Sequence, residues 1–115
     1  MASYEILTSQ ERLDELMSAD ATTRTILFKH SLTCPVSTAG FREFEKYVDG
    51  LGDDAGGIFA LIQIQNQRPL SNRVAEVTGV KHESPQAVIM EAGKVLWHAS
   101  HWDLTVKSIG TAFEA

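Results

Sequence analysis

TILFKHSLTCPVS, residues 25–37, leads from a strand-like run of residues into a helix-like one. Residues 25–29 are short, mostly apolar and bounded by polar residues, as in a strand that is covered on both faces. Four apolar residues after Cys34 then recur at helical spacing: Phe41, Phe44, Val48 and Leu51. Pro35 suits the first helical turn, where a missing N–H removes no hydrogen bond. We therefore predict that Cys34 lies at a strand-to-helix junction.

The remaining sequence alternates between strand and helix patterns. Strands are predicted for residues 4–7, 58–64, 86–90 and 95–99. Helices are predicted for residues 9–19, for a segment from Pro69 through Leu70, Val74 and Val77 to a stop at Gly79, and for a terminal face of Trp102, Val106, Ile109 and Phe113. Thr8 with Glu11 and Ser100 with Asp103 have the spacing of capping boxes for the first and last of these helices.

The order of these elements defines the fold class. The first strands are separated by helices, which predicts parallel strands with right-handed crossovers. Only residues 91–94 separate the last two strands, so these should form an antiparallel hairpin. We predict an α/β fold with the order βαβαβαββα: a thioredoxin-like three-layer α/β/α sandwich around a mixed central sheet, formed by residues 1–115 as a single domain.

Composition limits the classes of function. The 115 residues carry a formal net charge of -5, and Lys and Arg are scattered, which argues against nucleic acid as a partner. No apolar stretch is long enough to span a bilayer, and the N-terminus lacks a basic segment followed by an apolar run. We expect a cytoplasmic protein without a membrane partner. The sequence leaves its oligomeric state open.

The chain has one cysteine, Cys34, so it cannot form an internal disulfide or a multi-cysteine zinc site. An inert core position is the alternative to a reactive thiol. A helix N-terminus stabilises anions, which favours a nucleophilic thiolate at Cys34. Thr33 and Pro35 flank it, and Ser37 occupies the place of a second redox cysteine, so any mechanism must be monothiol. The Ser37 hydroxyl can either donate to the thiolate or bond the helix backbone.

Ser84 and Pro85 stand just before the predicted strand at 86–90. A proline that begins a strand is ordinary. In thioredoxin folds, however, the proline at this position is cis and packs against the active-site cysteine, and the backbone of the residue before it is free to pair with a substrate. The fold therefore predicts a cis Ser84–Pro85 bond, with both residues in the substrate-binding site.

The stretch KHSLTCPVS at 29–37, together with Phe41, Phe44 and the Ser84–Pro85 pair, resembles the monothiol bacilliredoxins of the bacilliredoxin C family. The resemblance runs from Ile26 to Trp102. It implies that Cys34 attacks mixed disulfides between proteins and bacillithiol, releases the protein thiol and carries bacillithiol until another thiol, from solution or from another protein, removes it. It implies S-bacillithiolated proteins as partners, bacillithiol as cosubstrate and no bound cofactor. The alternatives are an iron-sulfur cluster carrier like some monothiol glutaredoxins, or a thiol-redox sensor or binding module.

Other candidate residues receive structural interpretations. His98 and His101 lack a third metal-ligand partner in the pattern, so surface or capping roles are expected and no metal site is predicted. His30 would either relay a proton to Cys34 or close the preceding strand. One of Trp97 and Trp102 should pack in the core, although both suit a substrate groove. Lys29 and Arg42 are expected on solvated faces.

Overall fold

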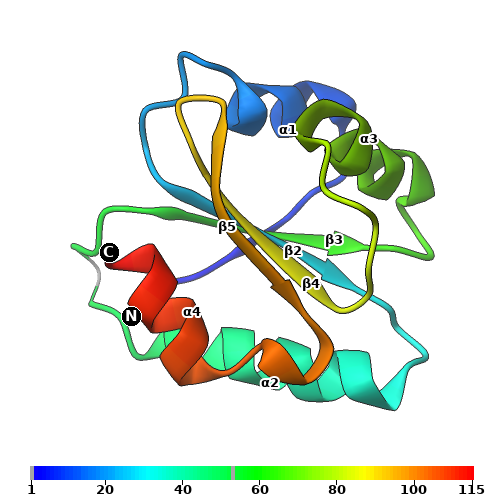
Figure 1. Ribbon diagram of the computed structural model, residues 1–115, viewed down its shortest axis with the longest axis vertical. Coiled ribbons are helices and arrows are strands. Elements are labelled where there is room, and N and C mark those ends of the chain that lie inside the picture. The colour runs from blue at the N-terminus through cyan, green and yellow to red at the C-terminus, as the bar shows by residue number, and fades with distance from the viewer. Residues whose placement is uncertain (1, 53) are drawn as a thin grey trace.

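The computed structural model describes residues 2–52 and 54–115 and shows a sheet covered on both sides by helices (Figure 1). Its strands are β1 (Glu5–Ile6), β2 (Thr25–His30), β3 (Ile58–Gln63), β4 (Gln86–Glu91) and β5 (Lys94–Ser100). Its helices are α1 (Gln10–Met17), α2 (Pro35–Asp49), α3 (Arg68–Thr78) and α4 (Val106–Phe113), with a 3₁₀ turn, η1 (His101–Asp103), before α4.

The five strands lie in the order β1-β3-β2-β4-β5. β1 and β2 pair with β3 in parallel, whereas β4 runs antiparallel to both β2 and β5. The predicted thioredoxin-like fold with a mixed sheet and the order βαβαβαββα is therefore confirmed, with η1 as an addition. Because the carboxyl ends of β2 and β3 share an edge with the start of β4, the segments after His30, after Gln63 and before Gln86 meet there.

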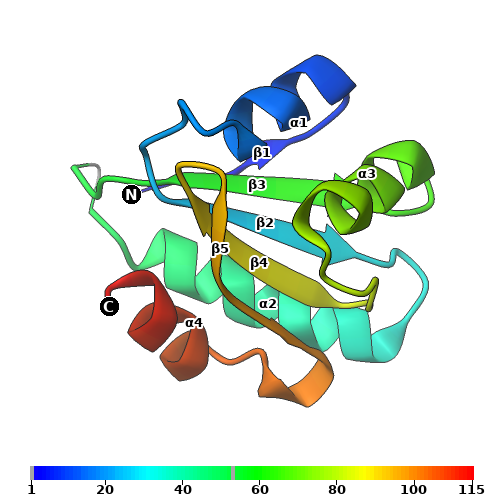
Figure 2. The ribbon, with the colours of Figure 1, turned by 45° about the horizontal axis from the view of Figure 1, so that its top comes forward.

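Two apolar cores separate the layers. α2 and α4 cover one face of the sheet, and α1 and α3 cover the other (Figure 2). Alternate residues of β2 supply both cores: Phe28 packs with Phe44 under α2, and Leu27 packs with Leu13 and Val74 under α1 and α3. These side chains are fully buried. The strand pattern at 25–29 thus arises from burial on both faces.

The residues that cap the first and last helices differ from those of both predicted capping boxes. Ser9, rather than Thr8, is the N-cap of α1, and its hydroxyl accepts the Arg12 N–H at 3.2 Å. α4 is capped by Thr105 and Ser108 in a reciprocal capping box, so the Ser100–Asp103 prediction is wrong. The residues from His101 form η1 instead.

Two predicted apolar positions are also corrected. Trp102 lies in η1 with 71% of its surface exposed, outside the helix face assigned to it. Val77 of α3 is also exposed, because α3 turns only its Leu70 and Val74 side toward the sheet. Gly79 ends α3, as predicted, and it does so in the left-handed conformation that a glycine adopts readily.

Candidate active site around Cys34

Cys34 is the N-cap residue of α2, and its side chain is partly exposed. Its carbonyl accepts the Thr38 N–H at 3.0 Å, the first hydrogen bond of the helix. The N–H groups of Val36 and Ser37 in the first turn have no carbonyl ahead of them in the helix to bond, and Pro35 has no N–H. A thiolate at Cys34 would therefore lie beside the positive end of a 15-residue helix.

Ser37, in the first turn of α2, is fully buried. Its hydroxyl oxygen accepts the Ser31 N–H at 2.8 Å and lies 2.9 Å from Nδ1 of His30. Burial lowers the pKa of His30, which favours a neutral ring at pH 7. With the oxygen occupied by Ser31, the hydroxyl proton can be donated to Nδ1. Ser37 therefore bonds His30 and the loop backbone at Ser31, instead of the Cys34 thiolate or the helix backbone, the two partners considered from the sequence.

His30 ends β2 and lies under α2. Its ring stacks on Phe41 with the ring centroids 4.7 Å apart. His30 is the last residue of the strand, which is one of the two roles considered for it from the sequence. Through Ser37 it also holds the first residue of the loop that leads to Cys34.

Gln65 fastens the same loop from the other side. This residue follows β3, and its side-chain amide makes three hydrogen bonds with three consecutive loop residues. It accepts the Leu32 N–H at 2.9 Å and donates to the hydroxyls of Ser31 at 2.9 Å and Thr33 at 3.3 Å. The loop before Cys34 is therefore held by Gln65, which follows β3, and by Ser37 of α2.

Pro85 reaches α2 at Gly40. The Ser84–Pro85 bond is cis, as predicted. A Cβ built on Gly40 would lie 3.1 Å from the Pro85 ring, so the absence of a side chain at Gly40 allows the close approach. Because Gln86 pairs with Lys29, Pro85 lies at the sheet edge where the Cys34 loop begins. The carbonyl of Pro85 accepts the His101 N–H at 3.1 Å.

Ser84 stands just outside β4. Its hydroxyl oxygen is buried and has no hydrogen-bond partner within residues 2–52 and 54–115. Among the backbone hydrogen bonds of these same residues, none uses the N–H or the carbonyl of Ser84. The backbone of Ser84 is therefore available to an external partner.

Lys29 departs from its expected place on a solvated face, because it is fully buried in β2. Its ammonium lies 3.2 Å from Nδ1 of His82, which also lies 3.3 Å from the hydroxyl of Ser71. Burial lowers the pKa of Lys29 from 10.5 to about 8. The pKa of His82 is lowered by burial and then by the charge of Lys29. This pair lies on the sheet face opposite to α2.

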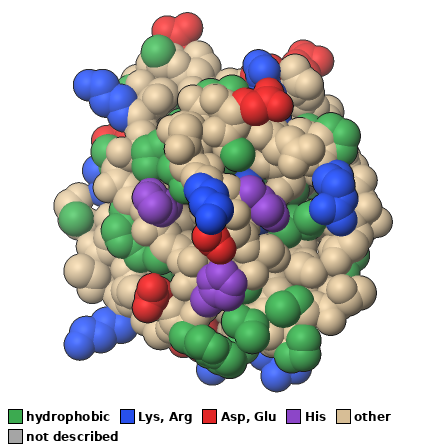
Figure 3. Space-filling model, turned by 45° about the vertical axis from the view of Figure 1, so that its right-hand side comes forward, with side chains coloured by type: hydrophobic (Ala, Val, Ile, Leu, Met, Phe, Trp, Pro, Cys, Tyr) green, Lys and Arg blue, Asp and Glu red, His purple; other side chains and the backbone are tan. Residues whose placement is uncertain are grey.

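The predicted site residues differ in accessibility. Thr33 and Pro35 are exposed, Cys34 and Ser84 are partly buried, and Ser37 and Pro85 are buried. The loop side of the molecule is turned forward in Figure 3, where histidine and charged side chains of both signs lie together beside hydrophobic ones. Sequence reasoning missed Gln65 and Gly40. The position of Gln65 directly after a parallel strand was the available signal, since ligands of open α/β sheets bind at that edge.

The histidines do not converge on a metal centre. In the described residues, no group of three or more histidine, cysteine, aspartate or glutamate side chains could hold a metal ion. His98 and His101 are both exposed, and Nδ1 of His101 lies 3.0 Å from the Ser100 hydroxyl. Trp97 packs against the core below α2 and α4, as expected for one of the two tryptophans. No helix in the described chain is long and apolar enough to cross a membrane.

The sheet order, with a free cysteine at the start of α2, is that of a thioredoxin-fold protein. The monothiol bacilliredoxin BrxC family matches residues 5–109. The chain therefore belongs to this family of thioredoxin-fold oxidoreductases.

Solved structures agree with this fold. The chain is 29% identical to a protein provisionally described as an oxidoreductase with a thioredoxin fold, with a TM-score of 0.79 over 95% of this chain and 92% of that one. Thioredoxin from Malassezia sympodialis is 13% identical, with a TM-score of 0.78 over 99% and 90% of the two chains. Thioredoxin from Trypanosoma brucei brucei is 18% identical, with a TM-score of 0.73 over 97% and 88%. The likeness to these two thioredoxins establishes the fold alone.

Proposed function

We propose that this protein is a monothiol thiol-disulfide oxidoreductase that removes bacillithiol from protein mixed disulfides through Cys34. The observation that carries the proposal is the partly exposed thiol of the chain's single cysteine at the N-terminus of α2. Membership of the monothiol bacilliredoxin family supports bacillithiol as the small thiol. Because this chemistry needs a reduced cysteine, we propose that the protein acts in the cytoplasm.

The reaction is a pair of thiol exchanges. The Cys34 thiolate attacks the bacillithiol sulfur of the mixed disulfide, the protein–bacillithiol S–S bond breaks, and the protein leaves as a thiolate. A second low-molecular-weight thiol, as its thiolate, then attacks the bacillithiol sulfur on Cys34. This step releases the Cys34 thiolate and forms a disulfide between the two small thiols, so the second thiol supplies the electrons. The helix N-terminus stabilises Cys34 both as nucleophile and as leaving group.

The residues around Cys34 support binding of an S-bacillithiolated protein. Thr33 and Pro35 are exposed beside the thiol, where they can contact the substrate. The backbone of Ser84, which has no hydrogen-bond partner in the described chain, can pair with an extended substrate segment. Pro85 packs against Gly40 and so fixes the position of Ser84 beside it. Ser37 acts through its hydrogen bond to Ser31 in the loop that leads to Cys34.

The test compares the wild-type protein with Cys34→Ala. Intact mass after mixing with bacillithiol disulfide should show one bacillithiol adduct on the wild type and none on the variant. Release of a bacillithiolated substrate protein should be lost in the variant. Its free energy of unfolding should stay within about 1 to 2 kcal/mol of the wild-type value, because the side chain is partly exposed.

Glutathione disulfide provides the matched control for the small thiol. Faster adduct formation with bacillithiol disulfide than with glutathione disulfide would support bacillithiol as the cosubstrate. Absence of an adduct with either, on folded and reduced protein, would contradict the exchange reaction. Visible absorption by the purified protein would instead indicate the iron-sulfur carrier.

A further inference from the structure

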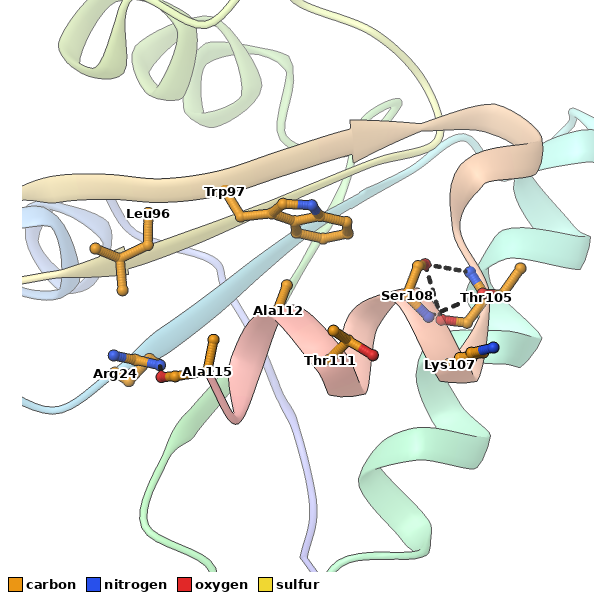
Figure 4. Close-up of a pocket in the computed structure, with 9 residues that line it drawn as sticks. All are labelled: Arg24, Leu96, Trp97, Thr105, Lys107, Ser108, Thr111, Ala112 and Ala115. Carbon is orange, nitrogen blue, oxygen red and sulfur yellow. Dashed lines mark hydrogen bonds between the residues drawn. The ribbon is translucent and has the colours of Figure 1, made fainter.

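A cavity of about 710 Å³ lies between β5 and α4 (Figure 4). It contains none of the residues that we assign to the thiol site: its walls come from β5 and α4, with Arg24 at one end. Its volume lies within the range of small-molecule sites, roughly 300 to 1,000 Å³. Any role of this cavity is therefore separate from the chemistry at Cys34.

A β-bulge builds the apolar wall of the cavity. Trp97 pairs with Ile89 and Val95 pairs with Met90, so Leu96 is an extra residue without a partner in β4. Regular alternation would turn Leu96 and Trp97 to opposite faces of the sheet. Figure 4 shows both side chains directed toward α4, where Ala112 lies across from Trp97. Leu96 keeps 44% of its surface exposed, so this wall is open to a ligand.

The charged side chains that line the cavity are cationic. Its two charged side chains are Arg24 and Lys107, and no Asp or Glu side chain lines it, although the whole chain has a net charge of -5; Ala115, which also lines it, offers a main-chain oxygen that Arg24 already binds. Arg24 is already engaged, because it donates to the main-chain oxygens of Phe113 and Ala115 and lies 3.3 Å from a Glu91 carboxylate oxygen. Lys107 makes no ion pair with any residue of the described chain. Lys107 is thus the cation available to a ligand.

We propose that this cavity binds a small amphipathic anion with a planar apolar body. The body lies on the wall of Leu96, Trp97 and Ala112, and the anionic group pairs with Lys107. The apolar lining supplies most of the affinity and Lys107 selects the charge, the usual division in small-molecule sites. The proposal does not depend on the thiol exchange proposed for Cys34.

Two fluorescent probes separate the apolar and ionic contributions. Anilinonaphthalenesulfonate is a planar aromatic anion, and phenylnaphthylamine has the same kind of aromatic body without the sulfonate. The wild-type protein should bind the anion saturably and more tightly than the neutral probe. In a Trp102→Phe background, emission from Trp97 should be quenched as the anion binds, because Trp97 is then the only tryptophan and lies in the cavity wall.

Charge reversal at Lys107 tests the anion contact. Lys107→Glu should weaken binding of the anion by about five-fold or more, since an exposed ion pair contributes up to about that factor and repulsion adds to its loss. It should leave the neutral probe unchanged. Lys94→Glu makes the same change of net charge at an exposed position of β5 outside the cavity and should leave both probes unchanged.

Leu96→Glu tests the wall itself. It should nearly abolish binding of the anion, whereas Val77→Glu makes a comparable change at an equally exposed residue of α3 and should have little effect. Non-saturable binding, or equal effects of Lys107→Glu and Lys94→Glu, would overturn the proposal. So would equal effects of Leu96→Glu and Val77→Glu. Circular dichroism of all variants identifies any that fail to fold.

Discussion

Lys29 and His30 are neighbours at the end of β2, and they occupy opposite faces of the sheet. Lys29 lies on the side of α1 and α3 with its ammonium beside His82. His30 lies under α2 with its ring bonded to Ser37, which in turn holds the backbone of the loop before Cys34. Both residues are buried and both have a lowered pKa, for which burial is the main cause. Only His30 is linked by hydrogen bonds to the loop of the thiol.

The difference separates two kinds of buried polar group. Lys29 has no ion-pair partner in the described chain, and a buried cation without a carboxylate costs stability. His30 and Ser37 form a short network in which each member satisfies another. We therefore expect changes at Lys29 to act on stability and its dependence on pH, and changes under α2 to act on the Cys34 loop.

Replacing Lys29 by methionine should give the largest change in stability. Lys29 has a pKa of about 8 in the folded protein and 10.5 as the ordinary value, so between these pH values the unfolded state binds more protons. The contribution of Lys29 to stability is thus most unfavourable below about pH 8 and improves as pH rises. Lys29→Met should raise the free energy of unfolding at pH 7 by roughly 3 kcal/mol at most.

Urea unfolding of both proteins at several pH values between 7 and 9.5 would measure this effect. The stability advantage of the variant should shrink toward pH 9.5, and the pKa of His82, followed by NMR, should rise when the nearby cation is removed. Lys94→Met, at an exposed position, is the control and should show neither change. If the variant's gain in free energy of unfolding stayed constant across this pH range, the burial of the Lys29 charge would not be what destabilises the wild-type protein.

Two buried serines extend the comparison to hydroxyl groups. Ser37→Ala leaves the Ser31 N–H and Nδ1 of His30 without their partner, so it should cost about 2 kcal/mol of stability. Ser71→Ala on the opposite face removes one contact from His82, which keeps Lys29 as a partner. It should cost under about 1 kcal/mol. Thermal unfolding measures both losses, and equal losses would contradict the difference between the faces.

The rate of adduct formation at Cys34 distinguishes the same two variants. Ser37→Ala should slow the reaction of Cys34 with bacillithiol disulfide, because it loosens the loop at Ser31. Ser71→Ala should react at the wild-type rate. Equal rates for both would remove Ser37 from the site and leave it a structural role alone.

The fold followed from the sequence because burial patterns are periodic. Residues 25–29 were predicted as a strand from their apolar run, and the run reflects cores on both faces. Lys29 belongs to that run, yet its burial was not predicted, because a cation at a strand end is ordinarily solvated. Only the tertiary neighbours His82 and Ser71 show how its head group is accommodated.

The cap of α1 illustrates a second limit. Thr8 and Ser9 are adjacent hydroxyl residues, and the capping-box spacing to Glu11 favoured Thr8; in the structure Ser9 caps the helix through the Arg12 N–H instead. Gly40 carries no local signal either, since a glycine within a helix is uninformative until Pro85 is placed against it. Cys34 and the cis Ser84–Pro85 bond were predicted because the fold class fixes both positions along the chain.

Gln65 should show the smallest effect on stability and a selective effect on exchange. Its amide is exposed, so water can replace the hydrogen bonds that Gln65→Ala removes, and the loss should stay under about 1 kcal/mol. The loop from Ser31 to Thr33 would then be held from the α2 side alone, and adduct formation at Cys34 should slow by about three-fold or more. Asn66→Ala is the matched control, because within the described part of the chain that side chain bonds only Gln63. Gln65→Glu keeps the oxygen that accepts the Leu32 N–H but loses the amide N–H donors, so an intermediate rate of adduct formation would show that both halves of the amide position the loop. A wild-type rate in Gln65→Ala would contradict this role and show that the contacts from α2 suffice.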